Sequence, residues 1–140
     1  MKFTLNFSFD LKRFSILNRE KVWVLVMLLI VSGVSIGSFI FYWQNGLGLS
    51  YNDARSHLDI GRRVVEGLKP GIAQLGSVWL PLPHALMIPT IWNDFMWHSG
   101  LSGAIISMLS FVSTCGVIYM YLKKIHVGLF GRLAGVTVFA

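Results

Sequence analysis

The sequence predicts an all-α integral membrane protein with two transmembrane helices and the start of a third. Hydrophobic residues make up 54% of the chain and charged residues only 13%, whereas soluble domains carry about 25% charged residues. Two long runs, 22–43 and 101–122, contain no charge and are long enough to cross a hydrocarbon core of about 30 Å. The basic residues flank these runs instead of forming one patch, which argues against a nucleic-acid partner and for a lipid bilayer.

The basic residues also predict the orientation in the plasma (inner) membrane. Residues 1–21 form a basic arm that we expect to lie against the cytoplasmic headgroups, which places the loop 44–100 on the external or periplasmic side. The lysines in the turn 123–126 agree with this orientation. Residues 127–140 are predicted to start a third transmembrane helix; they are too few to span, so we expect the chain to be cut off within that helix.

An amphipathic helix of about residues 51–67 is predicted directly after the first run. Apolar residues recur there at helical spacing, and charged residues occupy the opposite face, which suits a membrane surface. Ser50 is predicted as the N-cap, with Asp53 completing a capping box. Gly67 and Pro70 are expected to end the helix.

The segment 71–92 is apolar, but its three prolines argue against a continuous spanning helix. Irregular backbone at membrane depth is tolerated only where protein buries it or where it lines a cavity. We therefore expect a short re-entrant or interfacial element packed under the preceding helix. Residues 93–100 are predicted to form a short polar and aromatic return.

Asp53 is the candidate catalytic residue. It is a carboxylate just outside a transmembrane run, in the first turn of a helix, where burial and the helix dipole act on an acidic group. Such a residue suits a general base that deprotonates an acceptor hydroxyl. The spacing alone favours a residue that only caps the helix.

Two histidines are candidate substrate-binding residues. His57 lies one turn after Asp53, so both side chains can project to the same side of the helix. His84 stands between prolines in an apolar context and is suited to line a cavity. A hydrogen-bonded structural histidine is the alternative at each position. The spacing of Asp53 and His57 is weak evidence for a metal, because a closed site needs three or four ligands; no metal site is assigned, and a divalent metal stays open.

Two adjacent arginines complete the candidate substrate-binding set. Arg62 and Arg63 suit a lipid phosphate, because a guanidinium binds phosphate oxygens bidentately. They equally fit the solvated face of the helix, and for Arg62 the spacing to Asp59 and Glu66 favours ion pairs within that face.

Two stretches carry a resemblance to a known family. The pattern Tyr-Asn-Asp-Ala-x-x-His-Leu at 51–58 and the run GRRVVEGLKPGIAQLGSVWLPLPHALMIP at 61–89 resemble the first external loop of GT-C-type membrane glycosyltransferases. More narrowly, they are similar to bacterial members of the dolichyl-phosphate-mannose protein mannosyltransferase-like family. The resemblance covers 22–124, which is only the opening part of such an enzyme, so it implies the remainder of a helical bundle as a partner. A chain that ends here is not expected to turn over.

The resemblance implies a specific chemistry. Asp53 matches the catalytic base of that family, and the donor is a polyprenyl-phosphate-linked sugar attacked by an acceptor hydroxyl on the external side. Many relatives have two neighbouring acidic residues at this point, whereas this chain has Asn52 and Asp53. That departure leaves a single base and puts a metal or second-carboxylate role in doubt.

Two other function classes stay open. A non-catalytic multi-span membrane protein, such as a transporter or an assembly subunit, would use the external loop as a structural element. A sensor would need a cytoplasmic output domain, and the sequence contains none. A transporter would more naturally carry Asp or His within a span, and neither apolar run has one. These absences favour the glycosyltransferase.

Overall fold

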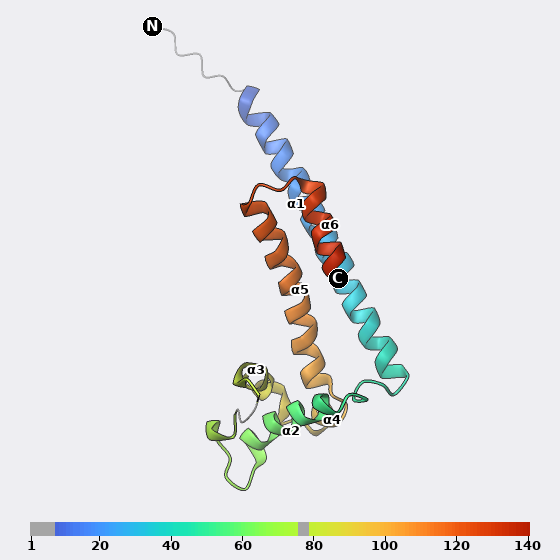
Figure 1. Cartoon of the computed structure of the whole chain (residues 1–140), viewed down its shortest axis with the longest axis vertical. Helices are drawn as coiled ribbons and strands as arrows, with labels where there is room; N and C mark the ends of the chain where they lie inside the picture. The colour runs from blue at the N-terminus through green and yellow to red at the C-terminus, as the bar shows by residue number, and fades with distance from the viewer. Residues whose placement is uncertain (1–7, 76–78) are drawn as a thin grey trace. The chain divides into compact units, whose positions relative to one another are not determined.

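The computed structural model describes the backbone of residues 8–75 and 79–140, and within these ranges the side chains from residue 19 onward. This part of the chain contains helices and no β-strand, so the predicted all-α class is confirmed (Figure 1). The elements are α1 (Ser8–Gln44), α2 (Asn52–Glu66), the 3-10 helix η1 (Ile72–Gln74), α3 (Pro81–Ile91), α4 (Asp94–His98), α5 (Leu101–Lys124) and α6 (Leu129–Phe139).

Two helices are long and apolar enough to cross a membrane, namely Arg19–Gln44 within α1 and Leu101–Lys124. Only 11% of the most apolar part of each is buried, whereas the core helix of a soluble protein is largely buried. By length, composition and exposure they suggest a membrane protein, in agreement with the two predicted runs. The helix α1 begins at Ser8 and not at Val22, because the residues between contain neither proline nor glycine to stop it. Residues 1–7 of the predicted basic arm lie outside the described residues.

The chain divides into two compact units. One, here called the loop unit, comprises residues 34–113, and the other, the terminal unit, comprises the residues up to 33 and from 114 onward. Helices α1 and α5 each contribute residues to both.

In the loop unit, α1 ends in a Schellman motif. The amide of Leu47 donates to the Tyr42 carbonyl at 2.8 Å and that of Gly46 donates to the Trp43 carbonyl at 3.0 Å. Gly46 has φ of 69°, in the left-handed region that glycine adopts without a Cβ penalty. The turn after α1 therefore has a local cause, because the motif satisfies the last carbonyls of that helix.

The core of the loop unit lies between α2, α3 and the first turns of α5 (Figure 1). Leu58, Met87 and Ile91 are buried together, and partly buried hydrophobic side chains pack against them. The buried Ser102 hydroxyl of α5 lies 2.7 Å from the Thr90 hydroxyl of α3, and this contact joins the two helices.

The proline-rich segment forms a short helix and not a span. Pro81 is the first residue of α3 and Pro83 lies in its first turn, where a missing amide hydrogen costs nothing. Pro89 lies inside α3, which ends two residues later at Ile91. The packing of this element against α2 agrees with the prediction for 71–92, although residues 76–78 lie outside the described residues. Likewise, the predicted return contains α4, whose N-cap Asn93 accepts from the Met96 amide.

The helix predicted over about 51–67 is confirmed as α2, but its N-cap is not. Tyr51 occupies the cap position without a side-chain cap bond, and the Ser50 hydroxyl donates instead to the Leu47 carbonyl at 2.8 Å. The Schellman motif at the end of α1 presents that carbonyl to Ser50, so the predicted capping box with Asp53 is wrong. Leu68, which follows α2, is fully exposed.

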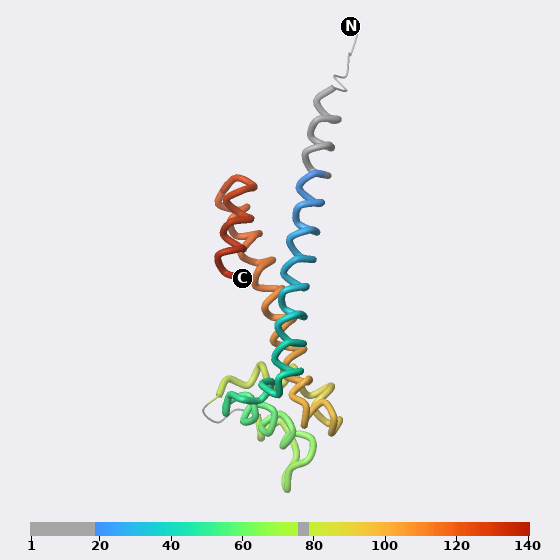
Figure 2. The backbone as a smooth tube through the Cα atoms, turned by 90° about the vertical axis from the view of Figure 1, so that its right-hand side faces the viewer, coloured from blue at the N-terminus to red at the C-terminus, as the bar shows by residue number. Residues whose placement is uncertain are grey.

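The terminal unit contains a second helix reversal. After α5 the chain turns back into α6 (Figure 2), through bonds from the Val127 amide to the Leu122 carbonyl and from the His126 amide to the Lys123 carbonyl. His126 occupies the left-handed position with φ of 61°. The segment 127–140 is thus helical, as predicted, over Leu129–Phe139.

Gly100 offers a test of the packing between the loop that follows α1 and the turn that joins α4 to α5. Its φ is 78°, and a Cβ built there would lie 2.7 Å from Leu49 Cδ2. We expect Gly100→Ala to lower the free energy of unfolding by about 1–3 kcal/mol, through backbone strain and overpacking. Gly48→Ala is the matched control, because a Cβ at Gly48 meets nothing within 4 Å. Thermal unfolding in detergent, followed by circular dichroism, measures both; equal midpoints for the two variants would contradict the described packing.

Candidate functional site

The candidate site residues all lie in the loop unit, on or beside α2. Because α2 packs along α3, a residue of one helix can meet a residue that is far away in the chain. Two groups of polar side chains result, a histidine pair and an arginine cluster around Trp97.

The histidine pair joins α2 to α3. His57 Nδ1 lies 2.7 Å from His84 Nε2, and the two rings have centroids 4.9 Å apart at an interplanar angle of 27°. The Trp79 ring lies against His57, with the two ring centroids 4.8 Å apart. The sequence singled out both histidines separately, and the structure brings them together.

His84 is fully buried, and its Nδ1 atom has no hydrogen-bond partner. Burial lowers the pKa of His84, and the nearby His57 lowers it further. An orphaned acceptor is tolerated better than an orphaned N–H, so we assign the proton of neutral His84 to Nε2, which donates it to His57 Nδ1. Of the pair, His57 is the member that lines a pocket.

A pocket of about 340 Å³ lies beside the first turns of α2 and α5. His57 is its one imidazole, and most of the remaining wall consists of glycine, alanine and apolar side chains, including Ala54, Pro83 and Met87. Asp53 does not line it, although the next residue in the chain does. The pocket is therefore a mainly apolar space whose polar side chains are His57 and Ser107.

Asp53 lies half-exposed in the first turn of α2. The neighbouring Asp53 carboxylate raises the pKa of the Tyr51 phenol. The ion pairs of the described residues do not include Asp53. The carboxylate is thus accessible and is not neutralised by a neighbouring cation.

Arg62 is buried, contrary to its predicted place on a solvated face. Its Nε donates to Glu66 at 2.8 Å, its Nη1 donates to the Ile91 carbonyl at 2.8 Å, and its Nη2 pairs with Asp94. These partners come from α2, the end of α3 and the start of α4. The predicted pair with Glu66 is present, but Asp59 pairs with Arg55 at 3.1 Å instead.

Trp97 is the residue around which the arginines gather. Its indole nitrogen donates to Asp59 at 2.9 Å, and the guanidinium groups of Arg55 and Arg62 lie 4.5 Å and 4.9 Å from its ring centroid. Sequence reasoning missed Trp97 and Asp94, since no local pattern links a residue to a partner some thirty positions away. Asp59, Asp94 and Trp97 gave only a weak signal. A carboxylate favours a nearby cation, and the indole nitrogen of a buried tryptophan favours a hydrogen-bond acceptor.

Arg63 differs from its neighbour. It is exposed and lines a shallow pocket of about 350 Å³ together with Arg55, Glu66 and Trp97. Within the described part of the chain, its guanidinium has neither an ion pair nor a hydrogen bond. Of the two predicted phosphate-binding arginines, Arg63 is therefore the one with free donors.

The described residues do not form a group of side chains suited to bind a metal ion. Among them, no three His, Cys, Asp or Glu side chains come close enough together to hold an ion. The histidine pair supplies two nitrogens, but they face each other across a hydrogen bond.

Comparison with protein-family models, with curated proteins and with solved structures finds no match for this chain.

The arginines provide a test of which residue is structural. We expect Arg62→Gln to lower the free energy of unfolding by roughly 1.5–3 kcal/mol, because the hydrogen bonds of a charged group are lost. Arg63→Gln should change it by less than about 0.5 kcal/mol, as exposed substitutions do. Chemical denaturation in detergent measures both. If Arg62→Gln is as stable as Arg63→Gln, the network does not hold these helices together.

The histidine pair predicts a pH dependence of stability. Because the pKa of His84 lies below its usual value of 6.5, the unfolded chain binds a proton in that pH range that the folded chain does not. The stability that the neutral, buried His84 contributes is therefore fully present above about pH 6.5. As the pH falls below this value, the free energy of unfolding decreases by at most about 1.4 kcal/mol per pH unit. We expect the thermal midpoint of the wild type to fall more between about pH 7.5 and about pH 5.5 than that of His84→Gln, which cannot titrate. Equal changes would show that His84 is not the titrating group.

Proposed function

We propose that this chain forms the N-terminal part of a membrane glycosyltransferase. The enzyme would move a sugar from a polyprenyl-phosphate donor to an acceptor hydroxyl on the external face of the membrane. The observation that carries this proposal is the position of Asp53, an accessible carboxylate in the first turn of α2, shortly after the candidate span Arg19–Gln44. The resemblance of residues 51–58 to the family's first external loop supports the same residue.

Asp53 would act as the general base. It accepts the proton of the acceptor hydroxyl while the hydroxyl oxygen attacks the anomeric carbon of the sugar. The bond between that carbon and the phosphate oxygen breaks, and polyprenyl phosphate leaves with the electron pair. Attack from the face opposite the phosphate inverts the anomeric centre. The phenol of Tyr51, whose pKa is raised by the neighbouring Asp53 carboxylate, would orient that carboxylate.

The remaining candidates take different roles in this proposal. Arg63 has free donors and would contact the donor phosphate. His57 lines the separate apolar pocket and would contact another part of the donor there. Arg62 is occupied by Glu66, Asp94 and the Ile91 carbonyl. We therefore assign it, with His84, to positioning: Arg62 holds α2 in place, and His84 orients the His57 ring.

One observation favours the alternative of a non-catalytic membrane protein. The polar side chains of α2 and α3 bind to each other: His57 contacts His84, and Arg62 donates to the Ile91 carbonyl. A loop whose polar residues serve mainly its own packing would suit a structural element in a transporter or an assembly subunit. The accessible carboxylate of Asp53 is the feature that such a role leaves unused.

The decisive variant is Asp53→Asn in the complete protein. Membranes that contain it are given polyprenyl-phosphate mannose or polyprenyl-phosphate glucose, and released polyprenyl phosphate is measured by chromatography. We expect wild-type membranes to release it and Asp53→Asn to lower the rate by about 100-fold or more, the contribution of a general base. Membrane insertion of the variant should be unchanged.

Asp59→Asn is the matched control. It removes a second carboxylate of α2 but keeps an oxygen that can accept from Trp97, so we expect its rate to stay within about threefold of the wild type. Consumption of neither donor by wild-type membranes, or an equal loss in the two variants, would contradict the proposed role of Asp53 and favour the structural alternative.

A further inference from the structure

A charged cluster in the terminal unit has no part in the proposed function. Glu20 of α1 lies at its centre. One oxygen of its carboxylate accepts from the Tyr119 hydroxyl at 3.0 Å and from Arg132 Nη1 at 2.7 Å, and lies 2.9 Å from Lys123 Nζ. These partners come from α5 and α6. A single carboxylate thus gathers two cations and a phenol from two other helices.

Positive charge exceeds negative charge at this end of the terminal unit. Among the described residues, the basic side chains in the cluster or beside it in the chain are Arg19, Lys21, Lys123, Lys124 and Arg132. Glu20 is the one carboxylate among them, and it is already shared by three donors. The cluster therefore carries a net positive charge.

A pocket of about 200 Å³ opens within this cluster, lined by Arg19, Glu20, Trp23, Leu129 and Arg132. Arg132 is fixed in place, because its Nε donates to the Val127 carbonyl at 2.8 Å and its Nη1 to Glu20. Its other terminal nitrogen, Nη2, has no hydrogen-bond partner in the described part of the chain. The exposed Arg19 likewise has no ion pair there. Two guanidinium groups thus offer free donors to one pocket.

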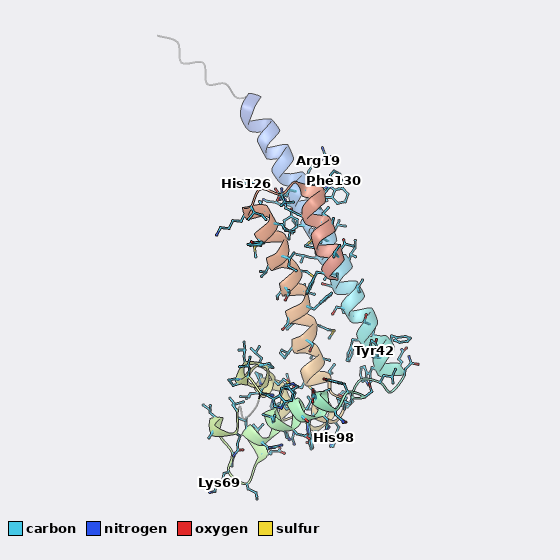
Figure 3. The ribbon with its side chains drawn as sticks, viewed as in Figure 1. Arg19, Tyr42, Lys69, His98, His126 and Phe130 are labelled. Carbon is cyan, nitrogen blue, oxygen red and sulfur yellow. The ribbon has the colours of Figure 1, made fainter. Side chains whose placement is uncertain are left out.

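The position of the pocket along the helices indicates the source of the anion. Arg19 is the first residue of one candidate span and Lys124 the last residue of the other, so the cluster lies where lipid headgroups would be. Figure 3 shows Arg19, His126 and Phe130 at this end of the terminal unit. Trp23 and Leu129 supply an apolar wall beside the arginines, and tryptophan favours the membrane interface.

We propose that this pocket binds the phosphate of an anionic phospholipid from the cytoplasmic leaflet. Arg19 and Arg132 bind the phosphate oxygens, and the acyl chains pass along the apolar side of Trp23. Glu20 is a positioning residue, since its bond to Arg132 Nη1 directs Nη2 to the pocket. The inference depends on α1 and α5 crossing a bilayer and is independent of sugar transfer. Basic pockets between transmembrane helices at the cytoplasmic side are a general form of lipid-headgroup site.

The test measures lipid binding to the purified protein in detergent by native mass spectrometry. The probes are phosphatidylglycerol and phosphatidylcholine with the same acyl chains, each with and without an excess of inorganic phosphate. We expect phosphatidylglycerol to bind more tightly, and Arg19→Gln to lower this preference about fivefold, the effect of one basic residue near an anionic lipid. Among the residues whose side chains are described, none forms an ion pair or a side-chain hydrogen bond with Arg19, so this variant should keep its thermal midpoint.

Lys69→Gln is the matched control, because it removes an exposed cation of the loop unit and should leave the preference unchanged. Three results would overturn the proposal: equal binding of the two lipids to the wild type, an equal loss in Arg19→Gln and Lys69→Gln, or displacement of phosphatidylglycerol by inorganic phosphate. The last result would make the pocket a site for free phosphate and not for lipid.

Discussion

The arrangement of the loop unit depends on one buried cation, the guanidinium of Arg62. A cation can be buried only where its donors are satisfied, and Arg62 meets this condition through Glu66 on its own helix, the Ile91 carbonyl and Asp94. The last two lie at the end of α3 and the start of α4, so one side chain joins three short helices. Both carboxylates are well exposed, which keeps the desolvation cost on the cation side alone. The turn between α3 and α4 thereby has a fixed place against α2.

Once α2 is fixed, the other features of the loop unit follow from its register. His57 meets His84 five residues before Arg62, and Leu58 enters the core with Met87 and Ile91. Asp53, one further turn toward the N-terminus, lies beyond this contact and stays accessible. The same helix therefore carries a packed half and an open end. An enzyme would use the open end, and a structural protein would use only the packed half.

Local patterns in the sequence predicted the elements but not the contacts between them. Helical spacing located α2, and prolines correctly argued against a spanning helix at α3, because both signals act within a few residues. The amphipathic pattern misassigned Arg62 to a solvated face, since it cannot register a carbonyl and a carboxylate that arrive from 91 and 94. Ser50 failed as a cap because the end of α1 offered its hydroxyl another acceptor. The candidate site was predicted as separate residues, and their pairing required the tertiary structure.

We propose that the segment between the two candidate spans lies on the external side of the membrane, and that Lys124, at the end of the second candidate span, lies on the cytoplasmic side. Cys115 is the one cysteine of the sequence, so Cys115→Ser provides a background for single-cysteine labelling. Lys69→Cys and Lys124→Cys are each treated with a membrane-impermeant maleimide, in intact and in permeabilised cells. With this topology, we expect the cysteine at position 69 to be labelled in intact cells and the cysteine at position 124 to be labelled only after permeabilisation. Labelling of both positions from the same side would contradict it.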